Sequence, residues 1–186
     1  MAVRVLTENL PYVPRLETEK LVLRGRTLDD FPASKKMWAD EDFTRYAGGK
    51  PLNEEQSWQK FLRTVGSWAL LGYGYWIVEE KETGAFVGDV GCGEYYRSIS
   101  PAIKGMPEIG WGIDPAHQGK GYGYEAAQAA FGWMRSRFPD LDLCCIIAPA
   151  NAPSIRIAER LGFAFSYRAD YHDAPIDVFV FRPTRP

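Results

Sequence analysis

The sequence has few of the residues that build disulfide frameworks and structural metal sites. Its 186 residues include only three cysteines and two histidines. Cys144 and Cys145 are adjacent, Cys92 stands alone, and neither His117 nor His172 lies near a Cys-x-x-Cys pair. A fold held together by disulfides is therefore excluded, and we expect no metal site.

Long apolar runs and a large excess of one charge are also missing. No segment is long enough to span a bilayer, and the first 18 residues contain no apolar stretch of the signal-peptide kind. The formal net charge is −2, which argues against a general binder of nucleic acids or membrane surfaces. We expect a cytoplasmic protein, monomeric or homodimeric, with no nucleic-acid or membrane partner.

The chain does contain enough apolar side chain to build a core. Hydrophobic residues make up 46% and aromatic residues 14% of its 186 positions, which is sufficient for one globular domain. We expect an irregular arm over residues 1–15, a single domain over 16–182 and a short tail over 183–186.

Hydrophobic periodicity and turn residues divide this domain into helices and strands. Helices are expected over about 28–38, after Asn53, and over about 122–137 and 153–161. Strands are expected over about 20–26, 74–80, 85–92, 108–113, 141–147, 163–170 and 176–182. This order indicates an α/β (α+β) fold with a mixed central sheet of about six to seven strands.

The most informative segment is Gln118-Gly119-Lys120-Gly121-Tyr122-Gly123, between a predicted strand and a predicted helix. Its three glycines keep side chains away from the backbone, so several N–H groups are open to one guest. The helix that follows adds its free N–H donors and the positive end of its dipole. The segment therefore predicts a phosphate site.

Known phosphate-binding loops differ in ways that the sequence can test. A Rossmann loop begins at the strand end, but residues 114–117 intervene here and no acid ends the next strand. A Walker loop needs Ser or Thr after its lysine, but Gly121 follows Lys120. The pattern Gln/Arg-x-x-Gly-x-Gly/Ala fits as Gln118, Gly121 and Gly123. A glycine-rich connection without any ligand is the remaining alternative.

With this loop the chain resembles the GNAT superfamily of acetyl-CoA-dependent N-acetyltransferases, and most closely its branch of Rim-type ribosomal-protein acetyltransferases. The resemblance covers about residues 16–182. It is carried by four stretches, which are 16–24, 108–111 with 118–123, 151–154 and 160–163. It implies helices on both faces of the sheet, and two central parallel strands that splay apart to admit acetyl-CoA.

The resemblance also assigns residues to the coenzyme. The loop Gln118, Gly119, Lys120, Gly121, Tyr122 and Gly123 would hold the pyrophosphate. The backbone of Ile113 would bind the pantetheine arm, and Asn151 would contact the coenzyme as well as cap a helix. For Lys120, a solvated side chain is the alternative.

Glu108 takes the position of a glutamate base in many relatives. Strand alternation places it beside Gly110 and Gly112, on the face opposite Ile109 and Trp111, unless a bulge interrupts the strand. Deprotonating an α-amine at pH 7 costs only about 1 kcal/mol, against about 4.6 kcal/mol for a lysine amine. A modest base, acting directly or through water, is therefore enough for an N-terminal amine. A solvated or salt-bridged glutamate is the alternative.

Ser154 matches the position near the departing sulfur, where a hydroxyl can orient or protonate the thiolate. Some relatives use a tyrosine acid near the end of this helix, where the chain has Arg160 and Leu161. The acid role therefore falls on Ser154 or stays unassigned. The alternative for Ser154 is a purely structural place in the first turn of the helix.

We expect the amine to attack acetyl-CoA directly in a ternary complex, with backbone N–H groups stabilising the oxyanion. A covalent acetyl-cysteine is the second mechanism, although the three cysteines have no histidine beside them in sequence. The acceptor is a primary amine, either a protein N-terminus or a small molecule. We expect it to enter from the side opposite acetyl-CoA, bounded by the first two helices and by loops over 94–107 and 170–176. A non-catalytic acyl-CoA-binding sensor or interaction module is the alternative function.

Overall fold

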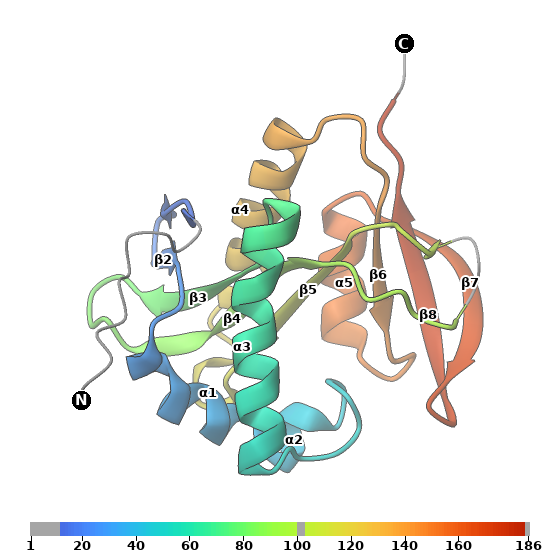
Figure 1. The fold of residues 1–186 in the computed structure, drawn as a ribbon. Coiled ribbons are helices and arrows are strands. Elements are labelled where there is room, and N and C mark those ends of the chain that lie inside the picture. The colour runs from blue at the N-terminus through green and yellow to red at the C-terminus, as the bar shows by residue number, and fades with distance from the viewer. Residues whose placement is uncertain (1–11, 100–102, 185–186) are drawn as a thin grey trace.

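The structure, a computed structural model, describes residues 12–99 and 103–184, so most of the predicted arm lies outside it. Its centre is an eight-stranded mixed sheet in the order β1-β2-β3-β4-β5-β6-β8-β7 (Figure 1). The strands are β1 (Leu16–Glu17), β2 (Leu21–Arg24), β3 (Tyr75–Glu80), β4 (Phe86–Gly93), β5 (Glu108–Ile113), β6 (Leu143–Ile147), β7 (Ala164–Tyr171) and β8 (Ala174–Phe181).

The predicted fold class is confirmed, with one strand more than expected. The extra strand, β1, has two residues and is too short to produce a recognisable hydrophobic period. The predicted loop over 170–176 is instead a two-residue turn between β7 and β8. His172 and Asp173 have φ values of 51° and 61°, the positive backbone angles that a tight hairpin requires.

Helices cover both faces of the sheet. They are η2 (Leu28–Asp30), α1 (Phe31–Trp38), α2 (Glu41–Thr44), α3 (Glu54–Leu71), η4 (Pro115–His117), α4 (Tyr122–Arg137) and α5 (Ala152–Arg160). Helix α2 was not predicted because its four residues span only one turn. The longest helix, α3, begins at a capping box of Asn53 and Gln56 and ends at Gly72, whose φ is 73°.

Aromatic side chains join the helices to the sheet. Trp76 of β3 packs edge-on against Trp133 of α4 with ring centroids 5.2 Å apart, and against Trp68 of α3 at 4.7 Å. Each such pair adds about 0.5–1.5 kcal/mol beyond the burial of its area. These contacts hold both α3 and α4 against β3. They therefore fix the positions of the two helices relative to the sheet.

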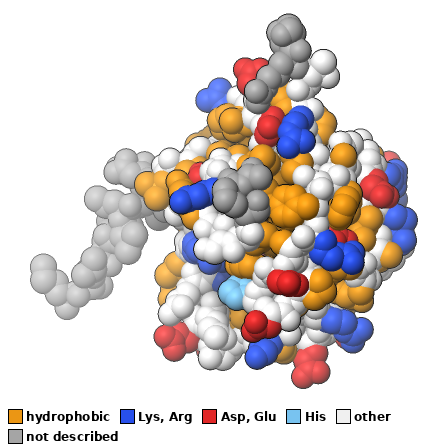
Figure 2. All heavy atoms as spheres, turned by 90° about the vertical axis from the view of Figure 1, so that its right-hand side faces the viewer, with side chains coloured by type: hydrophobic (Ala, Val, Ile, Leu, Met, Phe, Trp, Pro, Cys, Tyr) orange, Lys and Arg blue, Asp and Glu red, His pale blue; other side chains and the backbone are white. Residues whose placement is uncertain are grey.

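The outer strand β7 is mostly exposed along its length. Arg168 of β7 pairs with Asp177 of β8 through two hydrogen bonds of 2.7 and 3.0 Å. On the face that carries β7 and β8, hydrophobic side chains lie among charged ones (Figure 2). Charges on an edge strand oppose its pairing with other chains.

The central feature of the sheet is the separation of β5 from β6. Six residue pairs join β5 to β4, but a single parallel pair, Glu108 with Cys144, joins β5 to β6. A hydrogen bond of 3.0 Å from Cys144 N to Pro107 O lies at this same end. The two strands then diverge toward their C-terminal ends, as the predicted splay requires.

Strand β5 alternates without interruption, so the bulge considered for it is absent. The register shift lies elsewhere, between Val78 and Glu79 where β3 meets β4. The space beside Gly110 and Gly112 is filled by neighbouring side chains. A Cβ on Gly110 would lie 2.4 Å from the Tyr75 hydroxyl, and one on Gly112 would lie 2.8 Å from the Phe43 ring. The glycines therefore admit these two side chains to the strand.

Candidate active site

The glycine loop leads from η4 into α4 with two residues in left-handed geometry. Gly119 has a φ of 77° and Gly121 a φ of 83°, and open space lies where a Cβ would stand on either. Gly121 is the N-cap of α4 and provides no side-chain acceptor for the first N–H groups of the helix. These donors and the helix dipole face a space that is free of side chains, which suits an anionic guest.

The other loop residues are placed in different ways. Gly123 packs closely, because a Cβ there would lie 3.3 Å from Ile157 of α5. Tyr122 is buried and its hydroxyl donates to Glu80. The Lys120 ammonium lies 3.7 Å from the same carboxylate and is half exposed. Tyr122 therefore offers its backbone to the loop, while Lys120 forms a long, half-exposed ion pair with Glu80 at the edge of the loop.

Main-chain groups of β5 line the gap between the splayed strands. Asp114 N donates to Val87 O of β4, so the N–H and C=O groups of Trp111 and Ile113 point away from β4 and toward β6. The Gln118 side chain donates from Nε2 to the Ile113 carbonyl at 3.0 Å. Gln118 thereby ties the glycine loop to the end of the strand.

Helix α5 brings Ser154 to the opposite side of this gap. Asn151 caps the helix, its Oδ1 accepting from Ser154 N at 3.3 Å. The Ser154 hydroxyl accepts from the indole N–H of Trp111 at 3.2 Å. The Trp111 side chain of β5 and the Ser154 side chain of α5 therefore meet across the opening. Their hydrogen bond fixes the position of the Ser154 hydroxyl.

Glu108 lies at the closed end of the splay and is almost fully buried, with 8% of its surface exposed. Arg97 holds both carboxylate oxygens through its Nε and Nη2, the second at 2.8 Å. Arg97 also donates to the Tyr171 hydroxyl at 2.9 Å. Burial alone lowers the pKa of Arg97, but its bonds to Glu108 reverse the shift and keep the guanidinium charged. The salt-bridged alternative for Glu108 is therefore present in the structure.

The sequence did not single out Arg97 or Tyr171, since no motif surrounds either residue. Arg97 lies in the loop between β4 and β5, and Tyr171 lies at the end of β7, beside the turn to β8. The resemblance assigns both of these connections to the acceptor side. Among the aromatic residues of that side, Tyr95 packs against Arg97, whose guanidinium carbon lies 4.6 Å from the ring centroid. Burial raises the pKa of Tyr95 to about 12, so this tyrosine is a neutral group at physiological pH.

All three cysteines are buried. Burial raises the pKa of Cys144 to about 12 and raises those of Cys92 and Cys145 as well. A thiol needs its thiolate form to act as a nucleophile, so none of the three has the electrostatic environment of a reactive cysteine.

Lys60 of α3 lies on the sheet face that carries Glu108, and its ammonium group packs against an aromatic ring rather than a carboxylate. Its Nζ lies 3.8 Å from the centre of the Trp38 ring. Burial lowers the pKa of Lys60 to about 8, although Asp89 acts in the opposite direction. In the described part of the chain, no carboxylate lies within ion-pair distance of it, so its charge is weakly compensated.

Lys60→Met should therefore stabilise the protein at neutral pH by about 1–2 kcal/mol. This gain is smaller than the pKa shift alone would give, because solvent screens the partly exposed side chain. The folded pKa lies below the ordinary lysine value of about 10.4. The cost of the charge is thus complete below pH 8 and vanishes as pH rises toward 10.4. Urea unfolding at pH 7 and pH 10 tests this, and an equal gain at both values would contradict it.

Comparison with known proteins identifies the class. The model of the acetyltransferase (GNAT) domain family matches residues 20–164, and the chain belongs to this family. The protein is therefore an N-acetyltransferase of GNAT fold. In the described ranges, no helix has both the length and the apolar character needed to cross a membrane.

Individual relatives agree with this assignment. An uncharacterised N-acetyltransferase of Bacillus subtilis, YnaD, is 43% identical over 150 residues, which are 79% of this chain and 81% of the relative. A structure described as a GNAT-family acetyltransferase of Bordetella pertussis has a TM-score of 0.81 at 28% identity, covering 90% of this chain and 99% of the other. RimL, a ribosomal-protein acetyltransferase solved with coenzyme A, shares the fold at 15% identity and a TM-score of 0.71, over 89% of this chain and 96% of RimL.

Proposed function

We propose that the protein transfers the acetyl group of acetyl-CoA to a primary amine by direct attack in a ternary complex. The observation that carries this proposal is the single residue pair between β5 and β6. It leaves main-chain groups of Trp111 and Ile113 turned into a gap, with the start of α4 at one side and Ser154 at the other. This arrangement suits a long ligand with a phosphate end and a thioester end.

The chain's own residues divide the work along this gap. Residues 118–123 would bind the pyrophosphate, and Gln118 would position the end of β5 through the Ile113 carbonyl. Asn151 would hold the first turn of α5, and the Ser154 hydroxyl would orient or protonate the departing thiolate. Acetyl-CoA supplies the activated acyl group, and its thiol is a fair leaving group with a pKa near 8.5.

Glu108 would accept the amine proton through an intervening water. Both of its oxygens are held by Arg97, so direct contact with an amine would require the guanidinium to move. Arg97 and Tyr171 then act as positioning residues that fix the carboxylate at the closed end of the splay.

Initial rates of thiol release, measured with acetyl-CoA and a panel of amines, test the proposal. Direct transfer predicts amine-dependent release with intersecting lines in a double-reciprocal plot. Parallel lines would indicate a covalent acetyl-enzyme. Binding of acetyl-CoA without turnover of any amine would instead favour a sensor or interaction module.

Replacing Cys92, Cys144 and Cys145 with alanine, one at a time, should leave kcat within a few-fold of wild type. The reason is that buried thiols with raised pKa values cannot supply a nucleophilic thiolate. Rates must be measured well below each variant's melting temperature, because the substitutions create small cavities. Isolation of an acetylated cysteine that passes its acetyl group to the amine would contradict direct transfer.

A further inference from the structure

The charged groups around the Lys60 ammonium are more often positive than negative. The groups that act most strongly on the Lys60 ammonium are the carboxylate of Asp89 and three guanidinium groups, those of Arg63, Arg26 and Arg97. Glu108 is the second carboxylate here, paired with Arg97. The cluster therefore holds four cations against two carboxylates.

Both carboxylates already have an arginine partner. Arg26 reaches Asp89 at 3.3 Å, and both side chains are buried. Glu108 is held by Arg97. In the described ranges neither Lys60 nor Arg63 forms an ion pair, and they lie three residues apart on α3, which places them on neighbouring parts of its surface. The excess positive charge therefore belongs to these two residues of α3.

Hydrogen-bond donors without acceptors occur in the same cluster. In the part of the chain that the structure describes, Arg26 Nε and Trp38 Nε1 are buried and have no hydrogen-bond partner. The Arg26 side chain is only 4% exposed, and Trp38 is the ring beneath the Lys60 ammonium. Buried donors of this kind are costly unless an acceptor satisfies them, and an anion is the strongest acceptor.

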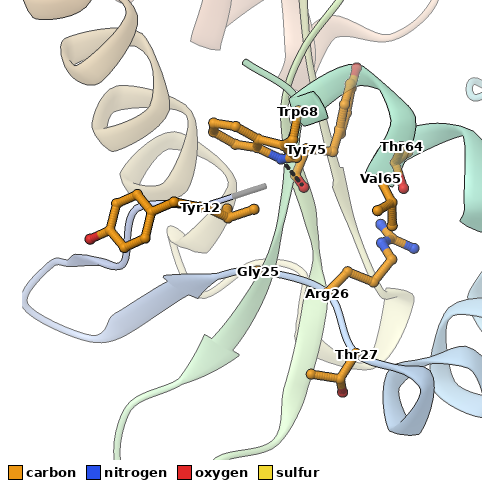
Figure 3. Close-up of a pocket in the computed structure, with 9 residues that line it drawn as sticks. Tyr12, Gly25, Arg26, Thr27, Thr64, Val65, Trp68 and Tyr75 are labelled. Carbon is orange, nitrogen blue, oxygen red and sulfur yellow. Dashed lines mark hydrogen bonds between the residues drawn. The ribbon is translucent and has the colours of Figure 1, made fainter. Parts of the chain in front are cut away.

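Arg26 also borders a cavity of about 300 Å³ between β2, α3 and β3. Its side chain extends from the end of β2 toward Thr64 and Val65 of α3, while Tyr75 lines the same cavity (Figure 3). The Tyr75 hydroxyl in turn lies beside Gly110 of the strand that carries Glu108. The cavity has the volume of a small-molecule site, and of the four cations Arg26 alone lines it, so Arg26 joins the cavity to the charged cluster.

We propose that the acceptor is a small amine that also carries an anionic group, a carboxylate or a phosphate, bound by Lys60 and Arg63. The unsatisfied N–H groups of Arg26 and Trp38 supply further donors to the anion. This inference rests on the proposed acetyl transfer, since it names the class of amine that would receive the acetyl group. It also accounts for Lys60, because a bound anion would compensate a charge that the folded protein otherwise leaves unpaired.

Matched pairs of amines test this inference with acetyl-CoA as donor. Each pair differs only in its anionic group, such as an amino acid and its amide, or phosphoethanolamine and ethanolamine. The anionic member of the best pair should have at least a tenfold higher kcat/KM, mainly through KM. The pairs that show the preference tell whether the anion is a carboxylate or a phosphate. Peptides that begin with an acidic residue, compared with matched peptides that lack one, form a further arm.

Lys60→Met should reduce the preference for the anionic member about tenfold. Lys36→Met, which removes an exposed lysine of α1, should leave it unchanged. The melting shift given by acetyl-CoA should remain in both variants, which shows that they are folded and bind the coenzyme. Equal kcat/KM within every pair, or a preference that survives Lys60→Met, would overturn the inference.

A second readout does not depend on turnover. With lysine labelled at Cε, NMR follows the titration of Lys60 in the presence of each amine. The anionic members should raise the pKa of Lys60 and the neutral members should not. If no amine is acetylated but the anionic members still raise it, acetyl transfer to small amines fails while the anion site stands. If neither member of any pair affects it, the anion site is absent.

Discussion

Gly121→Val should abolish the stabilisation that acetyl-CoA gives the folded protein. At a hundredfold excess of ligand over its dissociation constant, that stabilisation is about 2.7 kcal/mol. Gly121 has a φ of 83°, which a β-branched residue resists, and a side chain there would enter the open space at the start of α4. Both effects remove backbone N–H groups from the pyrophosphate. Thermal unfolding with and without acetyl-CoA measures the loss.

Gly132→Val is the matched control for this substitution. Gly132 lies in the same helix, is exposed, and has open space where a Cβ would stand without a positive φ. Because valine has a higher helix propensity than glycine, this variant should fold at least as stably as wild type and keep the full response to acetyl-CoA. If Gly121→Val melts higher with acetyl-CoA by as much as wild type does, the loop does not bind the pyrophosphate.

Glu108→Gln should lower kcat about 10²-fold near neutral pH, the range usual for loss of a general base. Raising the pH should partly restore activity, because more amine then arrives already deprotonated. The rescue should be larger for lysine-like amines than for α-amines, whose pKa is closer to neutrality. The substitution also leaves Arg97 without its full counter-charge, and breaking a buried ion pair typically costs about 3–5 kcal/mol of stability. Rates must therefore be compared below the melting temperature of the variant.

Arg97→Met separates a proton acceptor from a purely structural ion pair. If Glu108 takes the proton, this variant keeps the carboxylate and should retain more activity than Glu108→Gln. The double variant should then resemble Glu108→Gln. If the pair only holds the loop to the sheet, both single variants should lose activity alike, with the pH profile of wild type. That outcome would return Glu108 to a structural role.

Much of the fold follows from patterns that one strand or helix carries by itself. The alternation of Ile109 and Trp111 against Glu108 and Gly110 predicted the two faces of β5, and Asn53 marked the start of α3. The sequence could not predict α2 or β1, which are too short to show a period. Nor could it show that the space beside Gly110 and Gly112 is filled, because Tyr75 and Phe43 come from other elements.

The candidate site was predicted unevenly for a related reason. Residues 118–123 form a continuous segment, and its glycines indicate from the sequence alone that the backbone there is unusual. In the structure, two of these glycines have a positive φ. Arg97 reaches Glu108 from a loop, and Lys60 lies on a helix whose surface contains several other charges. Such pairings depend on tertiary contacts, so no local spacing reveals them. The roles of Glu108 and Ser154 stay predictions until the variants are measured.

Amide-resolved NMR of the protein during titration with acetyl-CoA tests the central claim most directly. The proposed binding mode predicts that the largest shifts fall on the amides of residues 119–124 and on those of Trp111 and Ile113, which face the gap between β5 and β6. Shifts confined to other parts of the sheet, with these amides unchanged at saturating acetyl-CoA, would contradict it.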